Sequence, residues 1–167
     1  MLAAGDRTGS LVRIESDDLT RPEVHALLAE HLAEMFELSP PDKVFALDLE
    51  RLRAPDVAFW TVWEDDLLLA CGALKAVSPT EGEVKSMRTP KARRRRGAAR
   101  AVLAHIIGVA RERGYRTLSL ETGSNPAFLP AQQLYRGFGF DACGPFGSYR
   151  ADPNSVFMSL RLASEAT

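Results

Sequence analysis

Residues 91–103, KARRRRGAARAVL, begin with a dense run of basic side chains and then turn small and apolar. Three arginines, residues 94–96, stand directly before Gly-Ala-Ala at 97–99, where a helix is expected to begin. A helix N-terminus offers unsatisfied N–H groups and a partial positive charge, so it attracts anions. Small residues let a phosphate approach the backbone closely, and arginine binds phosphate oxygens in pairs. The pattern favours a pyrophosphate site; a solvated charge run and a nucleic-acid contact are the alternatives.

Other side chains that could bind a metal or carry an acyl group form no recognisable set. Cys71 and Cys143 have no metal-ligand spacing and lie in apolar or glycine-rich stretches, so both are expected to be buried thiols. The three histidines, His25, His31 and His105, lack the spacing of a helical zinc site. We therefore expect no metal.

The composition is that of an ordinary globular protein. The chain has 167 residues, 46% of them hydrophobic, and its 21 basic and 22 acidic side chains leave a formal net charge of −1. A domain that binds nucleic acid is expected to be basic, so nucleic acid is not an expected partner. Residues 84–111 nevertheless contain no Asp or Glu, and this local positive field favours one specific anionic ligand. No run approaches the roughly 20 apolar residues of a membrane span, so we expect a cytoplasmic protein. Its length suits a single domain over residues 1–167.

The elements that position these residues follow from the apolar periodicity. Strands are expected at residues 11–15, 57–63, 67–77, 82–89 and 117–122, with two more beginning at 138–140 (FGF) and covering 156–162 (VFMSLRL). Helices are expected at residues 22–38, 44–51, 97–113 and 130–136. The helix between strands 82–89 and 117–122 requires those two strands to run parallel through a crossover. We predict a mixed α/β fold with a mainly antiparallel sheet of about seven strands.

Two motifs resemble elements of the GNAT (Gcn5-related) N-acetyltransferases. Residues 94–99, RRRGAA, fit the family's Arg/Gln-x-x-Gly-x-Gly/Ala element, and residues 131–140, AQQLYRGFGF, resemble its A-x-x-L-Y-x-x-x-G-F signature. The likeness is strongest over residues 82–140, and the tail SYRADPNSVFM resembles a branch of small bacterial acetyltransferases.

The resemblance implies the GNAT acyl-CoA N-acyltransferase fold, with acetyl-CoA in a splay between the parallel strands 82–89 and 117–122. Backbone groups of Met87, Arg88 and Thr89 would bind the pantetheine arm like an added strand. The residues implied at the pyrophosphate are Arg94, Arg95, Arg96, Gly97, Ala98, Ala99 and Arg100.

Transfer of an acetyl group to an amine needs a base for the amine, whose pKa is ordinarily about 10.4, and an acid for the leaving thiol. The resemblance makes Glu83 the expected base, acting directly or through a water. Glu83 lies four residues before Met87, so even spacing predicts that both side chains lie on one face of the strand. Glu83 could instead be an edge carboxylate paired with Lys85 or a nearby arginine, and Glu121 is the competing base. Tyr135 is the expected acid, and a purely structural core tyrosine is the alternative.

The predicted function is acetyl transfer from acetyl-CoA to an amine of a small molecule or a peptide. Direct transfer in a ternary complex is expected because no cysteine lies in either motif. The alternatives are a CoA-binding regulatory module without turnover and a nucleic-acid-binding domain. The acceptor pocket is expected from the helices before the first hairpin and from the loops at 123–130 and 144–153. Neither a membrane nor nucleic acid is expected as a partner, and a homodimer is an option.

Overall fold

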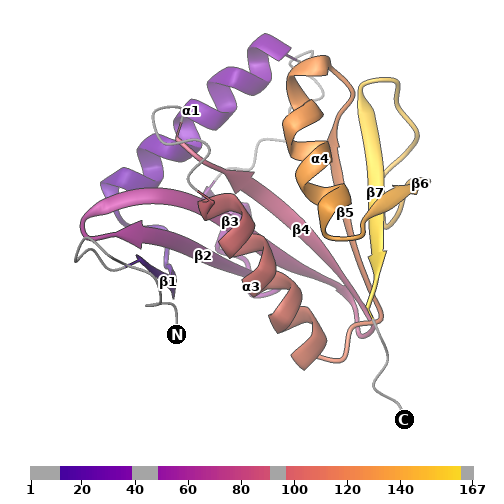
Figure 1. Cartoon of the computed structure of the whole chain (residues 1–167), viewed down its shortest axis with the longest axis horizontal. Coiled ribbons are helices and arrows are strands. Elements are labelled where there is room, and N and C mark those ends of the chain that lie inside the picture. Colours follow the sequence, from indigo (N-terminus) through magenta and orange to yellow (C-terminus); the bar gives the residue numbers. More distant parts are fainter. Residues whose placement is uncertain (1–11, 39–48, 91–96, 163–167) are drawn as a thin grey trace.

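The computed structural model describes residues 12–38, 49–90 and 97–162. Within those ranges seven strands form one sheet in the order β1-β2-β3-β4-β5-β7-β6 (Figure 1). The strands are β1 Val12–Ser16, β2 Val57–Glu64, β3 Leu67–Ser78, β4 Glu81–Arg88, β5 Thr117–Gly123, β6 Asp141–Cys143 and β7 Ser155–Arg161. The helices are α1 Pro22–Leu38, α2 Leu49–Leu52, α3 Ala98–Glu112 and α4 Leu129–Gly137, with a short 3-10 helix, η3, at Pro126–Phe128. The predicted fold class is confirmed.

Helices cover both faces of the sheet, and Figure 1 is viewed from the side of α3 and α4. On that side the apolar stripe of α3 (Val102, Leu103, Ile106, Ile107 and Ala110) packs into the larger core cluster. The spacing of this stripe is that of one helix face, which is why the segment forms a helix that lies flat on the sheet. On the other side α1 packs Val24, Leu27 and Leu28 against a second cluster of β2 and β3 side chains. The two faces are hereafter the α3 face and the α1 face.

The one parallel contact in the described sheet joins β4 to β5 through the crossover helix α3. It is short, because the paired residues are only Glu81 with Thr117, Gly82 with Leu118, and Glu83 with Ser119. Beyond these pairs the two strands diverge, as Figure 1 shows for β4 and β5. The parallel pair expected from the crossover is thus present and opens into a splay towards the carboxyl ends of both strands.

A β-bulge interrupts β4 beside the splay. Lys85 pairs with Ala73 of β3, but the next pair along is Arg88 with Cys71, so β4 carries one residue more than β3 over this stretch. The bulge includes Ser86, whose φ of 56° lies in the left-handed region that non-glycine residues rarely adopt. Such a bulge reverses the in-and-out alternation of the strand.

The bulge overturns one prediction about the candidate base. Glu83 pairs with Lys75 of β3 two residues from Ala73, which belongs to the α1-side cluster, so the Glu83 side chain lies on the α1 face. Met87 packs into the α3-side cluster, with its sulfur above Gly72 and beside Ile106. The expectation that Glu83 and Met87 share a face is therefore wrong, because even spacing holds only in a strand without a bulge.

Three smaller expectations also need correction. Residues 138–140 do not begin a strand: they form the turn that ends α4, with Gly139 at φ 103°, and β6 begins at Asp141. Cys71 is buried as expected, whereas Cys143 is exposed, because it lies on the edge strand β6. The helix expected at 44–51 is described only from Leu49, and residues 44–48 lie outside the described ranges.

Candidate active site

The predicted base, Glu83, lies at the point where the splay opens. It is the last β4 residue paired with β5, and only 4% of it is exposed. Its Oε2 accepts a hydrogen bond from the Tyr149 hydroxyl at 2.6 Å and lies 3.3 Å from the Lys85 ammonium. Lys85 Nζ also lies 3.3 Å from the Tyr149 oxygen, which closes a three-membered polar cluster. The alternative of an ion pair between Glu83 and Lys85 is therefore present, but as one edge of a larger arrangement.

The competing carboxylate, Glu121, lies on the same face. It is two residues beyond Ser119 in β5, whose register with β7 is unbroken, so it faces the same way as Glu83. The Ser155 hydroxyl donates to Glu121 Oε2 at 2.7 Å. Burial raises the pKa of Glu121 above its usual value, and the hydrogen bond from Ser155 offsets only part of that rise. The structure thus brings two carboxylates to the α1 face of the splay.

The predicted acid, Tyr135, approaches from the opposite side of the sheet. It lies on α4, is 7% exposed, and belongs to the α3-side cluster, where its ring meets Phe140 edge-on at 5.9 Å between centroids. Burial raises the pKa of Tyr135 above its ordinary value, so its hydroxyl stays protonated at neutral pH. The candidate base thus lies on the α1 face of the sheet and the candidate acid on the α3 face.

The start of α3 has the features of an anion site in its described part. Gly97 is the N-cap, with φ 79°, and a side chain there would meet nothing within 4 Å. The first helical hydrogen bond runs from Ala101 N to Gly97 O at 3.0 Å, so the N–H groups of Ala98, Ala99 and Arg100 point out of the helix start. The predicted ligands Arg94, Arg95 and Arg96 lie outside the described residues.

Arg100, also predicted at the pyrophosphate, lies over the ring of Phe138. Its guanidinium carbon is 5.3 Å from the centroid of Phe138, in the turn that ends α4. This cation–π contact links the first turn of α3 to α4. The contact leaves the predicted role of Arg100 in phosphate binding untested.

The residues predicted to bind the pantetheine arm follow the bulge. Met87 and Arg88 end β4, and Thr89 comes directly after it, all beyond the last pair with β5. Their backbone therefore borders the splay on a stretch where β4 has no β5 partner in the described sheet. At the bulge the Ser86 hydroxyl is buried and has no hydrogen-bond partner among the described residues, while its carbonyl accepts from the Cys71 thiol at 3.3 Å.

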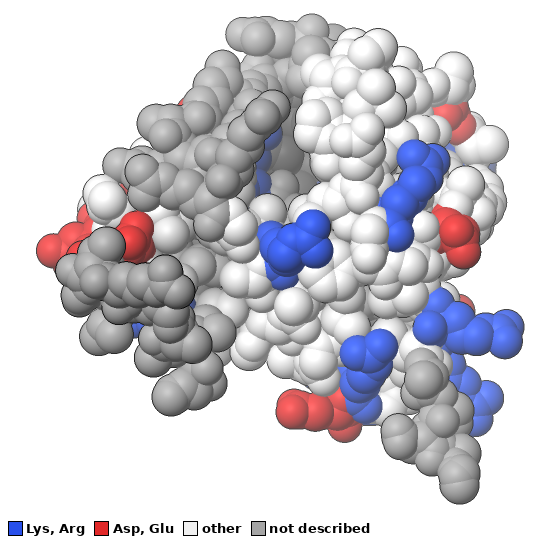
Figure 2. Space-filling model, viewed as in Figure 1, with Lys and Arg blue, Asp and Glu red and all other residues white. Residues whose placement is uncertain are grey.

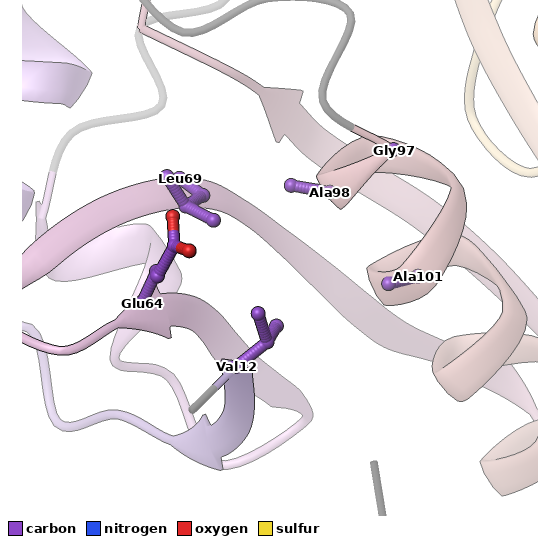
Figure 3. Close-up of a pocket in the computed structure, with 6 residues that line it drawn as sticks. All are labelled: Val12, Glu64, Leu69, Gly97, Ala98 and Ala101. Carbon is purple, nitrogen blue, oxygen red and sulfur yellow. The ribbon is translucent and has the colours of Figure 1, made fainter. Parts of the chain in front are cut away.

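A separate hollow of about 340 Å³ lies beside the start of α3 (Figure 3). Its lining residues are Val12, Glu64, Leu69, Gly97, Ala98 and Ala101. In Figure 3 the methyl groups of Ala98 and Ala101 point from α3 towards the side chains of β1, β2 and β3. The hollow thus lies between the start of α3 and strands β1–β3, and it shares Gly97 and Ala98 with the predicted pyrophosphate site.

The charge distribution bears on the alternative partners. On the face drawn in Figure 2 basic and acidic side chains are interspersed, and those of the described residues form no continuous positive band.

No group of His, Cys, Asp and Glu in the described ranges could hold a metal ion. None of the helices described is both long and apolar enough to cross a membrane.

Sequence reasoning missed the part played by Tyr149. The sequence pointed to the loop at 144–153 as part of the acceptor pocket but gave no link between Tyr149 and Glu83, which lie 66 positions apart. The signal was the tail SYRADPNSVFM, in which a tyrosine, an acid, a serine and a phenylalanine are closely spaced. Three of these side chains, Tyr149, Ser155 and Phe157, converge on the two carboxylates.

A parallel strand pair that splays beside a bulge, with a helix N-terminus facing the opening, is the architecture of an acyl-CoA N-acyltransferase. Solved structures bear out that class. A Klebsiella pneumoniae protein provisionally assigned as an acyl-CoA N-acyltransferase aligns with a TM-score of 0.73 and 27% identity, over 91% of this chain and 98% of that one. A Bacillus subtilis acetyltransferase solved in complex with CoA shares the fold with a TM-score of 0.68 at 19% identity, over 91% and 99% of the two chains.

Sequence comparisons identify the family. The family model described as the acetyltransferase (GNAT) family matches residues 24–140. The chain is 52% identical to an uncharacterised N-acetyltransferase, YsnE, of Bacillus subtilis, over 90% of this chain and all of that protein. It is 49% identical to an uncharacterised N-acetyltransferase, YedL, of Escherichia coli, over 89% and 94% of the two chains. It is also 35% identical to an IAA acetyltransferase of Azospirillum brasilense, over 90% and 98%. The chain belongs to the GNAT acetyltransferase family and is an acyltransferase.

Proposed function

We propose that the protein transfers the acetyl group of acetyl-CoA directly to an amine, with Glu83 as the base and Tyr135 as the acid. The observation that carries this proposal is the splay itself. Glu83 ends the β4–β5 pairing on the α1 face, and Tyr135 is buried on the α3 face. Acetyl-CoA, when bound, supplies the thioester that the amine attacks.

The described residues fit that cosubstrate. The exposed N–H groups at the start of α3 suit a pyrophosphate, and the unpaired edge of β4 after Glu83 suits the amides of a pantetheine arm. Arg94, Arg95 and Arg96 complete the proposed phosphate site from the preceding segment, with Arg100 at its helical side. Met87, Arg88 and Thr89 provide the proposed strand-like contacts.

The residues have complementary proton roles in this proposal. An alkylammonium acceptor must lose a proton before it attacks, and Glu83 takes that proton. Tyr135 then donates its hydroxyl proton to the departing sulfur, and the second proton that the attacking nitrogen loses restores this hydroxyl, whose pKa burial raises. No step needs a metal ion.

The state of the two cysteines supports direct transfer over an acetyl-cysteine intermediate. Burial raises the pKa of Cys71 to about 12, so its thiol is protonated and a poor nucleophile. Cys143 is exposed on the edge strand β6, two strands away from β5.

The acceptor itself is an amine of a small molecule or a peptide, and the name of the Azospirillum brasilense relative makes IAA one compound to include in an acceptor screen. Cytoplasmic residence stays a prediction.

Thermal unfolding with added ligands tests the cosubstrate. A ligand that binds only the folded state adds about 2.7 kcal/mol at 100 times its dissociation constant, so acetyl-CoA and CoA should both raise the midpoint while ATP should not. A shift with duplex DNA alone, present only at low salt, would instead support the nucleic-acid alternative.

The Glu83→Gln variant separates an enzyme from a CoA-binding regulatory module. It should keep the shift with acetyl-CoA and lower kcat by a factor on the order of 10² to 10⁴ in an assay of thiol release over an amine panel. An unchanged rate would show that Glu83 is not the base. Wild-type protein that binds CoA without releasing thiol over that panel would favour the regulatory module.

A further inference from the structure

The β6–β7 loop brings a phenol hydroxyl to the candidate base. Tyr149 donates to Glu83 Oε2 at 2.6 Å, and Lys85 Nζ reaches the same oxygen at 3.3 Å. The cluster is largely shielded from solvent, since the side chains of Lys85 and Glu83 are 17% and 5% exposed. Both donors meet on one oxygen, and Oε1 accepts no hydrogen bond from the residues that the structure describes.

Ring packing determines where the Tyr149 hydroxyl lies. The Tyr149 ring is 5.0 Å from that of Phe146 and 5.5 Å from that of Phe157, centroid to centroid, and those two rings are 5.9 Å apart. Phe157 is the β7 partner of Glu121, so this aromatic group stands beside the second carboxylate as well. Three mutually packed rings leave the phenol little freedom to turn away from Glu83.

The turn that follows Tyr149 is tied to the end of β5. Asp152 accepts from the backbone N–H groups of Asn154 at 2.8 Å and Ser155 at 3.0 Å, which closes the turn. Ser124, just after β5, donates its hydroxyl to the Pro153 carbonyl at 2.7 Å and its N–H to the Asn154 carbonyl at 3.1 Å. The segment that carries Tyr149 is therefore held to the same strand that forms one side of the splay.

The Tyr149 hydroxyl is a donor that stays protonated. Burial raises its pKa above the ordinary value, and the nearby charge of Glu83 and the hydrogen bond to it raise the pKa further. A donor to one carboxylate oxygen stabilises the ionised form of that carboxylate and fixes the plane in which the second oxygen points.

We propose that Tyr149 and Lys85 are the positioning pair of the base. They hold Oε2 of Glu83, so that Oε1 is presented to the ammonium of the acceptor. The proton passes from the acceptor nitrogen to Oε1, and Tyr149 keeps its own proton throughout. This inference rests on the proposed function, because it takes Glu83 to be the base.

Several charged groups lie around Glu83 and Glu121 on this side of the sheet. Lys85 is on its own strand, Lys75 is its β3 partner, and Glu121 lies on β5. Asp152 of the β6–β7 loop adds negative charge close to Glu121. The hydrogen bond from Tyr149, at 2.6 Å, is the shortest contact that Glu83 makes in this cluster, so ionised Glu83 should be sensitive to its removal.

The test is the Tyr149→Phe variant, which keeps the ring contacts and deletes only the hydroxyl. We expect kcat at neutral pH to fall, the KM for acetyl-CoA to stay unchanged, and the acidic limb of the kcat/KM profile to move up by about one pH unit. The side-chain carboxyl carbon of Glu83, observed by ¹³C NMR at pH 7 and assigned through Glu83→Gln, should change its chemical shift in the variant because it loses a hydrogen-bond donor. Lys85→Met should move both readouts in the same direction.

Tyr115→Phe is the matched control. Tyr115 is also a buried tyrosine, but it packs on Gly82 from the α3 face, so loss of its hydroxyl should move neither readout. An unchanged Glu83 carboxyl signal and an unchanged pH profile in Tyr149→Phe would overturn the proposal, even if that variant unfolds at lower temperature.

The base assignment and the positioning role fail differently. If Glu83→Gln is slow while Tyr149→Phe matches the wild type, only the positioning role is wrong. If Glu83→Gln keeps the full rate, the base assignment is wrong and the positioning role with it. The NMR measurement needs no acceptor, so its result stands whether or not an amine substrate is in hand.

Discussion

Glu83 of β4 and Ser119 of β5 are the last residues that pair before the two parallel strands separate. This pair lies where the sheet changes from a continuous hydrogen-bonded surface to an opening. Beyond it Glu121 continues the same face of β5, so both candidate carboxylates border the opening from one side. At this place Glu83 is only 4% exposed, so its partners are the side chains packed around it.

The Tyr135→Phe variant should lose activity without losing the fold. We expect kcat to fall by a factor on the order of 10² to 10⁴, because the leaving sulfur loses its proton donor. Since burial raises the pKa of Tyr135, the wild-type rate should not decline through ionisation of this hydroxyl as pH rises to about 10, its ordinary value. Rate profiles from pH 6 to pH 10 for both proteins would check this. Equal rates would mean that Tyr135 serves the core alone.

Gly97→Ala should weaken both folding and acetyl-CoA binding. The φ of 79° at Gly97 costs an alanine roughly 1–2 kcal/mol, although no atom lies within 4 Å of the new methyl group. The matched control is Gly108→Ala in the same helix, where there is also open space and no positive φ, and which should stabilise by roughly 0.5–1 kcal/mol. Urea unfolding and calorimetric titration with acetyl-CoA would measure the two effects. If Gly97→Ala and Gly108→Ala changed the free energy of unfolding equally and in the same direction, the left-handed conformation of Gly97 would be contradicted.

Glu121→Gln should stabilise the protein at neutral pH. Folding raises the pKa of Glu121 above its unfolded value of 4.5, so this carboxyl stabilises the folded state fully only below pH 4.5. That stabilisation is lost as the pH rises through the raised pKa. The variant removes this loss, so its stability relative to the wild type should grow between pH 4 and pH 7. Glu112→Gln, an exposed carboxyl at the end of α3, should show no such trend. Unfolding midpoints measured across this range test the prediction. A difference between Glu121→Gln and the wild type that stays constant from pH 4 to pH 7 would refute the burial effect.

The two cysteines should differ sharply in reactivity. Burial raises the pKa of Cys71 to about 12, so a thiolate-selective reagent at pH 8 should not modify it in the folded protein. Cys143 is exposed and should react. Folded protein should therefore take up one equivalent and denatured protein two. Cys143→Ser should abolish labelling of the folded form, and residual labelling would place Cys71 at the surface.

Much of the fold could be read from the sequence because its cues are local. The boundaries of α1 agree with the prediction at both ends, since Pro22 opens the helix and the segment Ser-Pro-Pro follows Leu38. The parallel pairing of β4 with β5 followed from the intervening helix, because a crossover is what joins parallel strands. The small residues before and within the first turn of α3 also led to the predicted anion site, which stays a prediction.

The tertiary structure decided which side chains meet. The bulge at Ser86 arises from the register between β4 and β3, and no period within β4 reveals it, so Glu83 and Met87 fall on opposite faces. The contact between Tyr149 and Glu83 joins residues 66 positions apart, and it depends on the packing of three rings and on a turn tied to β5. Local patterns specify elements and their faces, whereas the partners of a buried carboxylate are chosen by the whole sheet and the loops packed on it.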